Sequence, residues 1–179
     1  MVLIAGAVMA GFLFFSPDVQ ACANGADAKN PESQPGVTLP VERQFETIAQ
    51  AERFICHSIA YPRDESATLE GVTAFRSGSL QQVVEGDATA EVRLQYRIAP
   101  SGRLLQLNVS PQDLGAPRAS PQSQTLRVQG QEALLTPGGP SLDYVQVDWR
   151  KDGLSFHAQA QLSDGFTLEM LLVALESTR

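Results

Sequence analysis

The sequence EVRLQYRI at residues 91–98 alternates strictly between polar and apolar side chains. In an extended chain, successive side chains point to opposite faces, so the two kinds of residue separate onto two sides. The apolar side consists of Val92, Leu94, Tyr96 and Ile98, and the polar side of Glu91, Arg93, Gln95 and Arg97. This period of two predicts a strand with one face packed on a core and the other face in water.

Two hairpins are predicted around and beyond this strand. The turn Ser101-Gly102 leads the chain into a second alternating run, Leu105–Val109. Farther along, Val145–Trp149 alternates, Asp152-Gly153 turns the chain and Leu154–Ala160 returns. Short turns of this composition between alternating segments favour antiparallel hairpins. Two further segments are weaker strand candidates, namely Leu69–Phe75 and Leu126–Val128.

A helix is expected at each end of the strand region. Val41–Phe54 carries apolar residues close to helical spacing among charged and amide residues. Thr167 is the expected cap of a closing helix, LEMLLVALEST, whose core-facing stripe is Leu168, Leu171, Leu172 and Leu175. The order helix, meander, helix predicts an α+β fold: an antiparallel β-sheet of hairpins with the N-terminal and C-terminal helices packed on one face.

The first residues have the composition of a targeting segment. Val2–Phe15 is an unbroken apolar run of 14 residues, followed by Ser16, Pro17 and Asp18. A bilayer core requires about 20 apolar residues, whereas a signal peptide requires about 7 to 15. Residues 1–23 are therefore expected to be a signal peptide or membrane anchor. Residues 24–40 are rich in Pro, Gly, Asn and Ser, which predicts a flexible stalk before an extracytoplasmic domain at residues 41–179.

Several fates of this segment stay open. Ala21-Cys22-Ala23 places small residues as a cleavage site requires, which would release a chain beginning near Asn24. Val19-Gln20-Ala21-Cys22 resembles a lipobox, which implies lipid attachment at Cys22. Because no Lys or Arg precedes the apolar run, a start farther upstream or a longer spanning helix is also open. In every version the domain is extracytoplasmic, either membrane-anchored or secreted.

The two cysteines of the chain are Cys22 and Cys56. A disulfide between them requires that Cys22 is neither lipidated nor cleaved off. Otherwise Cys56, in the sequence Phe54-Ile55-Cys56, is expected to be a small buried hydrophobic residue.

Charge and composition exclude some classes of partner. The chain carries 13 Lys and Arg against 20 Asp and Glu, a formal net charge of −7. Such a charge repels phosphate backbones, so no nucleic-acid partner is expected. Hydrophobic residues make up 43% of the sequence, which is typical of a globular domain.

The sequence offers little catalytic chemistry. The histidines are His57 and His157, and His157 lies on the polar phase of its strand, where a solvent-facing position is expected. No nucleophile elbow, zinc spacing or calcium loop accompanies them. We therefore expect no enzyme activity, no metal site and no cofactor.

Two weak candidates remain for binding a ligand or partner. Trp149 is a possible anchor, although a tryptophan at an inward strand position usually belongs to the core. Arg93, Arg97 and Arg103 are candidates for a carboxylate-binding patch across the first hairpin, although strand arginines more often pair with acidic residues.

Several segments in this order resemble a bacterial extracytoplasmic domain of unknown function, found in anti-sigma-factor-like membrane regulators and in lipoproteins. They are Ala51-Glu52-Arg53-Phe54 leading to Tyr61-Pro62, the strand Val92–Ile98, Val128-Gln129-Gly130-Gln131-Glu132-Ala133, Val147-Asp148-Trp149 with Asp152-Gly153, and the helix after Thr167. The layout is also similar, more loosely, to periplasmic lipoprotein-carrier proteins.

The first resemblance implies a non-enzymatic interaction or sensor domain, held at the membrane through its N-terminus, with a protein partner. The second implies a carrier-like domain with an apolar ligand between sheet and helix. We expect the first function and keep the second as the alternative.

Overall fold

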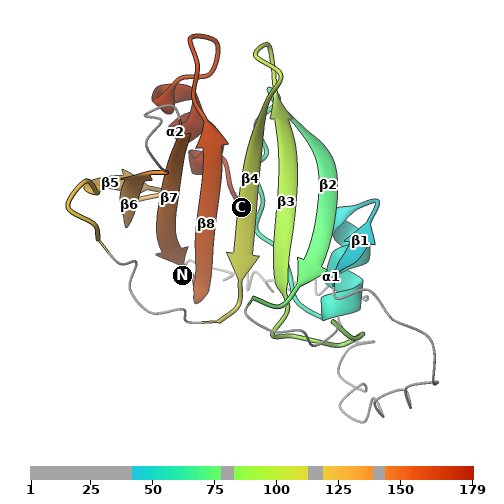
Figure 1. Cartoon of the computed structure of the whole chain (residues 1–179). Coiled ribbons are helices and arrows are strands. Elements are labelled where there is room, and N and C mark those ends of the chain that lie inside the picture. The colour runs from blue at the N-terminus through green and yellow to red at the C-terminus, as the bar shows by residue number, and fades with distance from the viewer. Residues whose placement is uncertain (1–41, 78–82, 113–118, 139–143) are drawn as a thin grey trace, which may run out of the picture.

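The computed structural model describes residues 42–77, 83–112, 119–138 and 144–179. The predicted anchor, the predicted stalk and Cys22 lie outside the described residues. The elements are β1 (Arg43–Phe45), α1 (Ile48–Ile55), β2 (Ala67–Phe75), β3 (Glu91–Ile98), β4 (Arg103–Ser110), β5 (Gln124–Val128), β6 (Gln131–Pro137), β7 (Tyr144–Lys151), β8 (Leu154–Gln161) and α2 (Leu168–Glu176). The predicted α+β class with an antiparallel sheet is confirmed (Figure 1).

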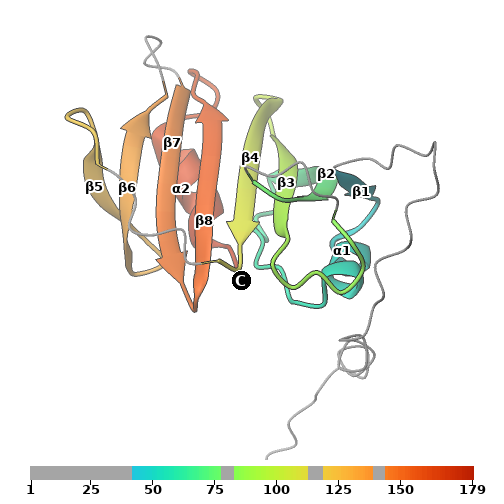
Figure 2. The same cartoon turned by 60° about the horizontal axis from the view of Figure 1, so that its bottom comes forward.

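The strands form one eight-stranded sheet in the order β1-β2-β3-β4-β8-β7-β6-β5. Each half of the sheet is a meander of consecutive strands, and the two halves meet where β4 pairs with β8 (Figures 1 and 2). On the core side of this seam, Leu107 lies opposite Ala158 and Leu105 lies opposite Ala160. At these two positions a large residue on β4 faces a small one on β8, whereas at the third buried pair Val109 faces the larger Phe156, so large and small side chains alternate across the seam.

The N-terminal helix is shorter than the sequence predicts. The expected helix at Val41–Phe54 is wrong in its first part, because Arg43–Phe45 forms β1 and pairs with β2. Helix α1 begins after Thr47, whose side chain accepts a hydrogen bond from the Gln50 backbone, while the Gln50 side chain accepts one from the Thr47 backbone. This reciprocal capping box gives hydrogen-bond acceptors to the backbone amides of Thr47 and Gln50, which have no partner within the helix because the helix begins here.

The C-terminal helix agrees more closely with its prediction. Thr167 caps α2 by accepting a hydrogen bond from the Met170 amide at 3.3 Å. Leu171 and Leu175 are fully buried as expected, but Leu168 and Leu172 are only half-buried. The third buried position of the helix is Ala174.

The β5–β6 turn is tied to the end of α2 by one side chain and its backbone. Gln129, which has a positive φ of 53°, donates from its side chain to the carbonyl oxygens of Leu175 and Thr178. Its backbone amide donates to the Glu176 carboxylate at 2.7 Å. These three bonds join the β5–β6 turn to backbone and side-chain oxygens at the end of α2, so they tie the helix end to the turn.

Of the two alternatives for Cys56, the buried free thiol is wrong. Cys56 is half-buried at the end of α1, in a left-handed conformation with φ 60°, and it is disulfide-bonded. The chain contains one other cysteine, Cys22. Lipid attachment at Cys22 stays a prediction, and it would exclude a disulfide between Cys22 and Cys56 of the same chain.

An ion pair ties the end of β2 to the segment that leads into β3. The buried carboxylate of Asp87 accepts hydrogen bonds from Arg76 at 2.6 and 2.7 Å and from the Thr89 hydroxyl and amide at 2.7 and 3.1 Å. Burial raises the pKa of Asp87, but the hydrogen bonds from Arg76 and Thr89 outweigh it and hold the pKa below its ordinary value. Asp87 therefore stabilises the folded state in its charged form.

Replacing Asp87 by asparagine is expected to lower the free energy of unfolding by about 2 kcal/mol at neutral pH, because it removes the charged acceptor that Asp87 offers to Arg76 and Thr89. Because the folded-state pKa is depressed, this contribution is complete above the unfolded pKa of about 3.9 and is lost as the pH falls through the folded pKa. Urea denaturation should show a constant difference in the free energy of unfolding between wild type and variant from about pH 7 to 5. This difference should shrink below about pH 4. Asp164→Asn, at an exposed position, is the control, and an equal loss in both variants would contradict the prediction.

Candidate binding site on the polar face of the sheet

Four glutamines lie in one row across the middle of the sheet. Gln95 on β3 is opposite Gln106 on β4, and Gln106 is opposite Gln159 on β8. Gln159 is in turn opposite Gln146 on β7. Because side chains alternate along a strand, these four glutamines share the face opposite the core. We call them the glutamine row.

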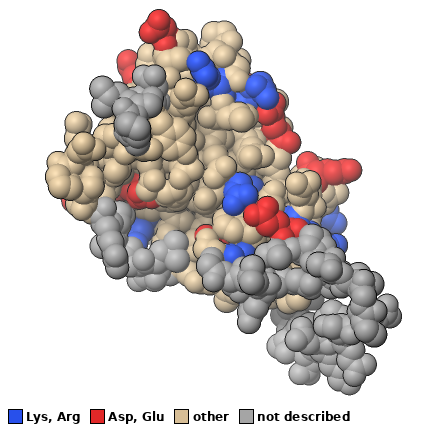
Figure 3. Space-filling model, viewed as in Figure 1, with Lys and Arg blue, Asp and Glu red and all other residues tan. Residues whose placement is uncertain are grey.

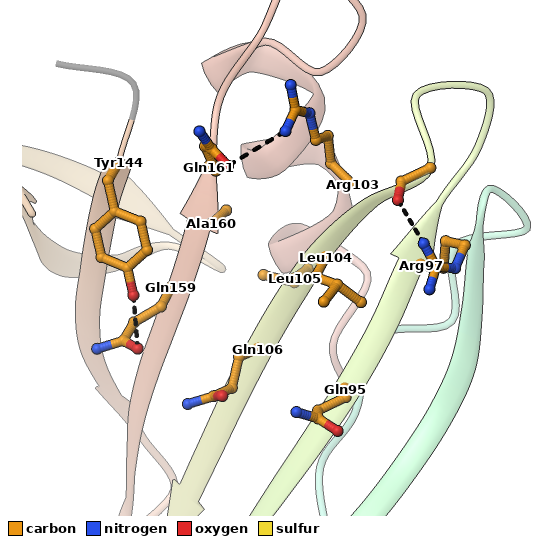
Figure 4. A pocket seen from close by; sticks show the side chains of 11 residues that line it. Gln95, Arg97, Arg103, Leu104, Leu105, Gln106, Tyr144, Gln159, Ala160 and Gln161 are labelled. Atoms are coloured by element: carbon orange, nitrogen blue, oxygen red, sulfur yellow. Dashed lines mark hydrogen bonds between the residues drawn. The ribbon is translucent and has the colours of Figure 1, made fainter. Parts of the chain in front are cut away.

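A groove of about 410 Å³ is lined by three members of this row, Gln95, Gln106 and Gln159, and extends to the place where β4 and β8 diverge (Figure 4). The paired register of these strands starts at Leu105 and Ala160, so Leu104 and Gln161 lie beyond the last pair. The groove volume falls within the range of about 300–1,000 Å³ that is typical of small-molecule sites. Its polar lining consists of Gln95, Gln106, Gln159, Gln161, Arg97, Arg103 and Tyr144. In Figure 3 the middle of this face is occupied mostly by neutral residues.

A chain of hydrogen bonds orients two members of the row. The Tyr144 hydroxyl donates to Gln159 Oε1 at 2.9 Å, and Gln159 Nε2 donates to His157 Nε2 at 2.6 Å. His157 Nδ1 donates to Asp148 Oδ1 at 2.5 Å, and Gln146 Nε2 donates to Asp148 Oδ2 at 2.8 Å. A neutral imidazole protonated at Nδ1 matches every donor to an acceptor. His157 thus lies on the solvent face as expected, but it is half-buried and hydrogen-bonded to Asp148 on β7 and to Gln159 on its own strand.

The other two members of the row are open. In the described part of the chain, neither the Gln95 nor the Gln106 side chain forms a hydrogen bond to protein. Gly71 lies opposite Gln95, and a Cβ atom there would come within 3.0 Å of Gln95 Oε1. The glycine thus leaves room for the Gln95 side chain. Two amide groups are therefore available to a molecule in the groove.

The three candidate arginines do not converge on one site. Arg97 lines the groove and forms a two-fold hydrogen bond with Glu70 at 2.5 and 2.9 Å, which raises the pKa of its guanidinium. Arg93 contacts Glu42 at 3.4 Å and lies over the Phe75 ring, outside the groove lining. Arg103 lines the groove and donates to Gln161 Oε1 at 3.2 Å. Only Arg97 and Arg103 can therefore face a ligand in the groove.

Trp149 lies in the core. It is 1% exposed and stacks on Phe156 with ring centroids 4.7 Å apart and planes 7° from parallel. Its side chain is on the face opposite the glutamine row, so a ligand in the groove does not reach it.

The sequence does not predict the glutamine row as a binding site. The available signal was an amide on the polar phase of each alternating strand, as in LQL at residues 105–107 and VQV at residues 145–147. That signal is weak because a polar residue at such a position is usually explained by contact with water. Only the register shows that the four amides are aligned.

No family model, curated protein or solved structure matches this chain. Within the described ranges, no helix has the length and apolar character needed to cross a bilayer. The same ranges contain no group of three or more His, Cys, Asp or Glu side chains placed to hold a metal ion. The resemblance to extracytoplasmic domains remains an interpretation of the sequence.

Proposed function

We propose that this chain is a non-enzymatic extracytoplasmic interaction or sensor domain, tethered at or exported across the membrane, that binds a polar ligand through the glutamine row. The observation that carries the proposal is the alignment of four amides on adjacent strands, two of which have no hydrogen-bond partner in the described part of the protein. Aligned polar groups that converge on a groove fix the orientation of a bound molecule. A surface that only needed solvation would not require this alignment.

We infer that both helices pack on the core face and leave the polar face open. The buried residues of α1 and α2 belong to the same cluster as the inward residues of the strands, and they are Ala51, Phe54, Ile55, Leu171, Ala174 and Leu175. With the groove turned to the viewer, α2 is drawn behind the strands (Figure 4). This arrangement supports a binding site in front of the sheet rather than between sheet and helix.

The carrier alternative places an apolar ligand between sheet and helix. Large side chains occupy that interior, since Trp149, Phe166 and Leu171 are all 0–1% exposed. A packed interior of this kind has no room for a lipid chain without displacement of the core. The polar face is therefore the better site.

A hydrolase is a third candidate, because Asp148 orients the imidazole of His157 as a carboxylate does in a catalytic pair. The remaining ring nitrogen, however, accepts from Gln159. Among the described residues, no hydroxyl or thiol is hydrogen-bonded to His157, so the pair lacks a nucleophile. This favours binding over catalysis.

Calorimetric titration of the full chain tests the proposal with four probes: a neutral hexasaccharide, an acidic hexasaccharide, a polar hexapeptide and palmitate. We expect a polar probe to bind, and Gln95→Trp to weaken its binding by about tenfold or more, because an indole at this exposed position fills the groove. Thr125→Trp, at an exposed position on the edge strand β5, is the control and should leave binding unchanged. Binding of palmitate alone, at equal affinity in both variants, would contradict the proposal and favour the carrier.

A further inference from the structure

The chemistry of the groove points to a particular class of ligand, on the basis of the proposed binding function. Each glutamine offers two donors and one acceptor oxygen without carrying charge. Hydroxyl groups also donate and accept at once, so a row of amides matches a molecule with many hydroxyls. Adjacent strands lie about 4.8 Å apart, so the three glutamines that line the groove extend over about 10 Å. A ligand that contacts all three is therefore extended and repeats its polar groups.

The groove also has two apolar side chains in its lining, those of Leu104 and Tyr144. Leu104 lines it and is 50% exposed, a large exposure for a leucine on a sheet. The ring of Tyr144 lines the other side, on β7 (Figure 4). Two separate apolar side chains among amides fit the C–H faces of sugar rings better than the continuous tail of a lipid.

Arg103 places a positive charge at one end of the groove, which favours a ligand with a negative group. Its guanidinium donates to the neutral Gln161, and no carboxylate of the described residues pairs with it. Arg97 differs, because Glu70 already occupies its planar fork. A guanidinium with free donors favours a carboxylate, which it binds through two parallel hydrogen bonds.

A peptide is less well matched to this place in the fold. Extended peptides usually pair their backbone with an exposed strand at the edge of a sheet. Along the glutamine row the backbone groups of β3, β4, β8 and β7 are paired with a neighbouring strand on both sides, and β4 separates from β8 only beyond Leu105 and Ala160. Over the row, a ligand therefore meets side chains rather than an open strand edge.

We propose that the groove binds an acidic oligosaccharide, with hydroxyl groups along the glutamine row and a carboxylate on Arg103. The test is calorimetric titration of the full chain with hexamers of galacturonic, glucuronic and mannuronic acid. The matched ligands are their methyl esters, which keep the sugars and remove the charge. We expect at least one acid to bind more tightly than its ester.

Arg103→Gln should weaken binding of that acid by about tenfold and leave binding of its ester unchanged, because the variant removes one charged hydrogen-bond donor. Arg127→Gln is the matched control, since Arg127 is exposed on β5 and the substitution removes the same charge. Circular dichroism of both variants establishes that they are folded.

Each of the other possible results contradicts a specific part of the proposals. If acid and ester bind equally, or if Arg103→Gln and Arg127→Gln weaken binding equally, recognition of a carboxylate by Arg103 is wrong. A third result is that no sugar hexamer binds, whereas the polar hexapeptide binds and Gln95→Trp abolishes binding of the peptide. In that case the assignment of an oligosaccharide as the ligand is wrong, and the proposed binding function stands. If no probe responds to Gln95→Trp, both are wrong.

Discussion

Replacing Trp149 by alanine is expected to lower the free energy of unfolding by about 3–5 kcal/mol, the largest loss among single substitutions considered for this protein. Trp149 is 1% exposed and lies between Ala133 on β6 and Phe156 on β8. Its removal leaves a cavity in the core and ends the ring stacking with Phe156. Urea denaturation followed by far-ultraviolet circular dichroism measures the loss without the tryptophan signal.

Leu104→Ala is the control for this substitution, because Leu104 is 50% exposed and its truncation creates no cavity. A loss below about 1 kcal/mol for Trp149→Ala would mean that the residue is not packed as described. The two variants should also differ in binding: Leu104 lines the groove, whereas Trp149 lies on the opposite face. A folded Trp149→Ala protein should therefore keep its affinity for a groove ligand.

Leu171→Ala in α2 is expected to cost about 2–5 kcal/mol, because this leucine is fully buried in the core. Leu172→Ala should cost less, about 1 kcal/mol, since Leu172 is only half-buried. Val173→Ala should be nearly silent, because Val173 is 56% exposed. Urea midpoints for the three variants should follow this order.

Three neighbouring residues of one helix thus form a graded series with similar chemistry. Equal midpoints for Leu171→Ala and Val173→Ala would contradict the docking of α2 on the sheet. The series also distinguishes the structure from the leucine stripe predicted from the sequence, in which Leu172 was expected to face the core. The helix instead buries Ala174, so the buried face is rotated away from Leu172.

The start of a helix was predictable from a capping residue but not from the spacing of apolar residues alone. Thr167 was recognised as a cap, and α2 begins directly after it. The equivalent signal for α1 is Thr47 followed by Gln50, whereas the apolar spacing from Val41 predicts too early a start. Spacing near 3.6 is a weak signal over so short a segment, because a short strand followed by a helix produces similar positions.

The alternating strands were specified by local sequence, since the period of two assigns each side chain to the core or to water without knowledge of its neighbours. The turns at Ser101-Gly102 and Asp152-Gly153 were local as well, because the positive φ angles of 65° at Gly102 and 80° at Gly153 suit glycine. The candidate site was not local. It depends on the pairing of β4 with β8, which are far apart in the chain, and on a register that places Gln106 opposite Gln159. A shift of that register by one residue would turn one partner of each pair to the other face, so the glutamine row exists only in the folded sheet.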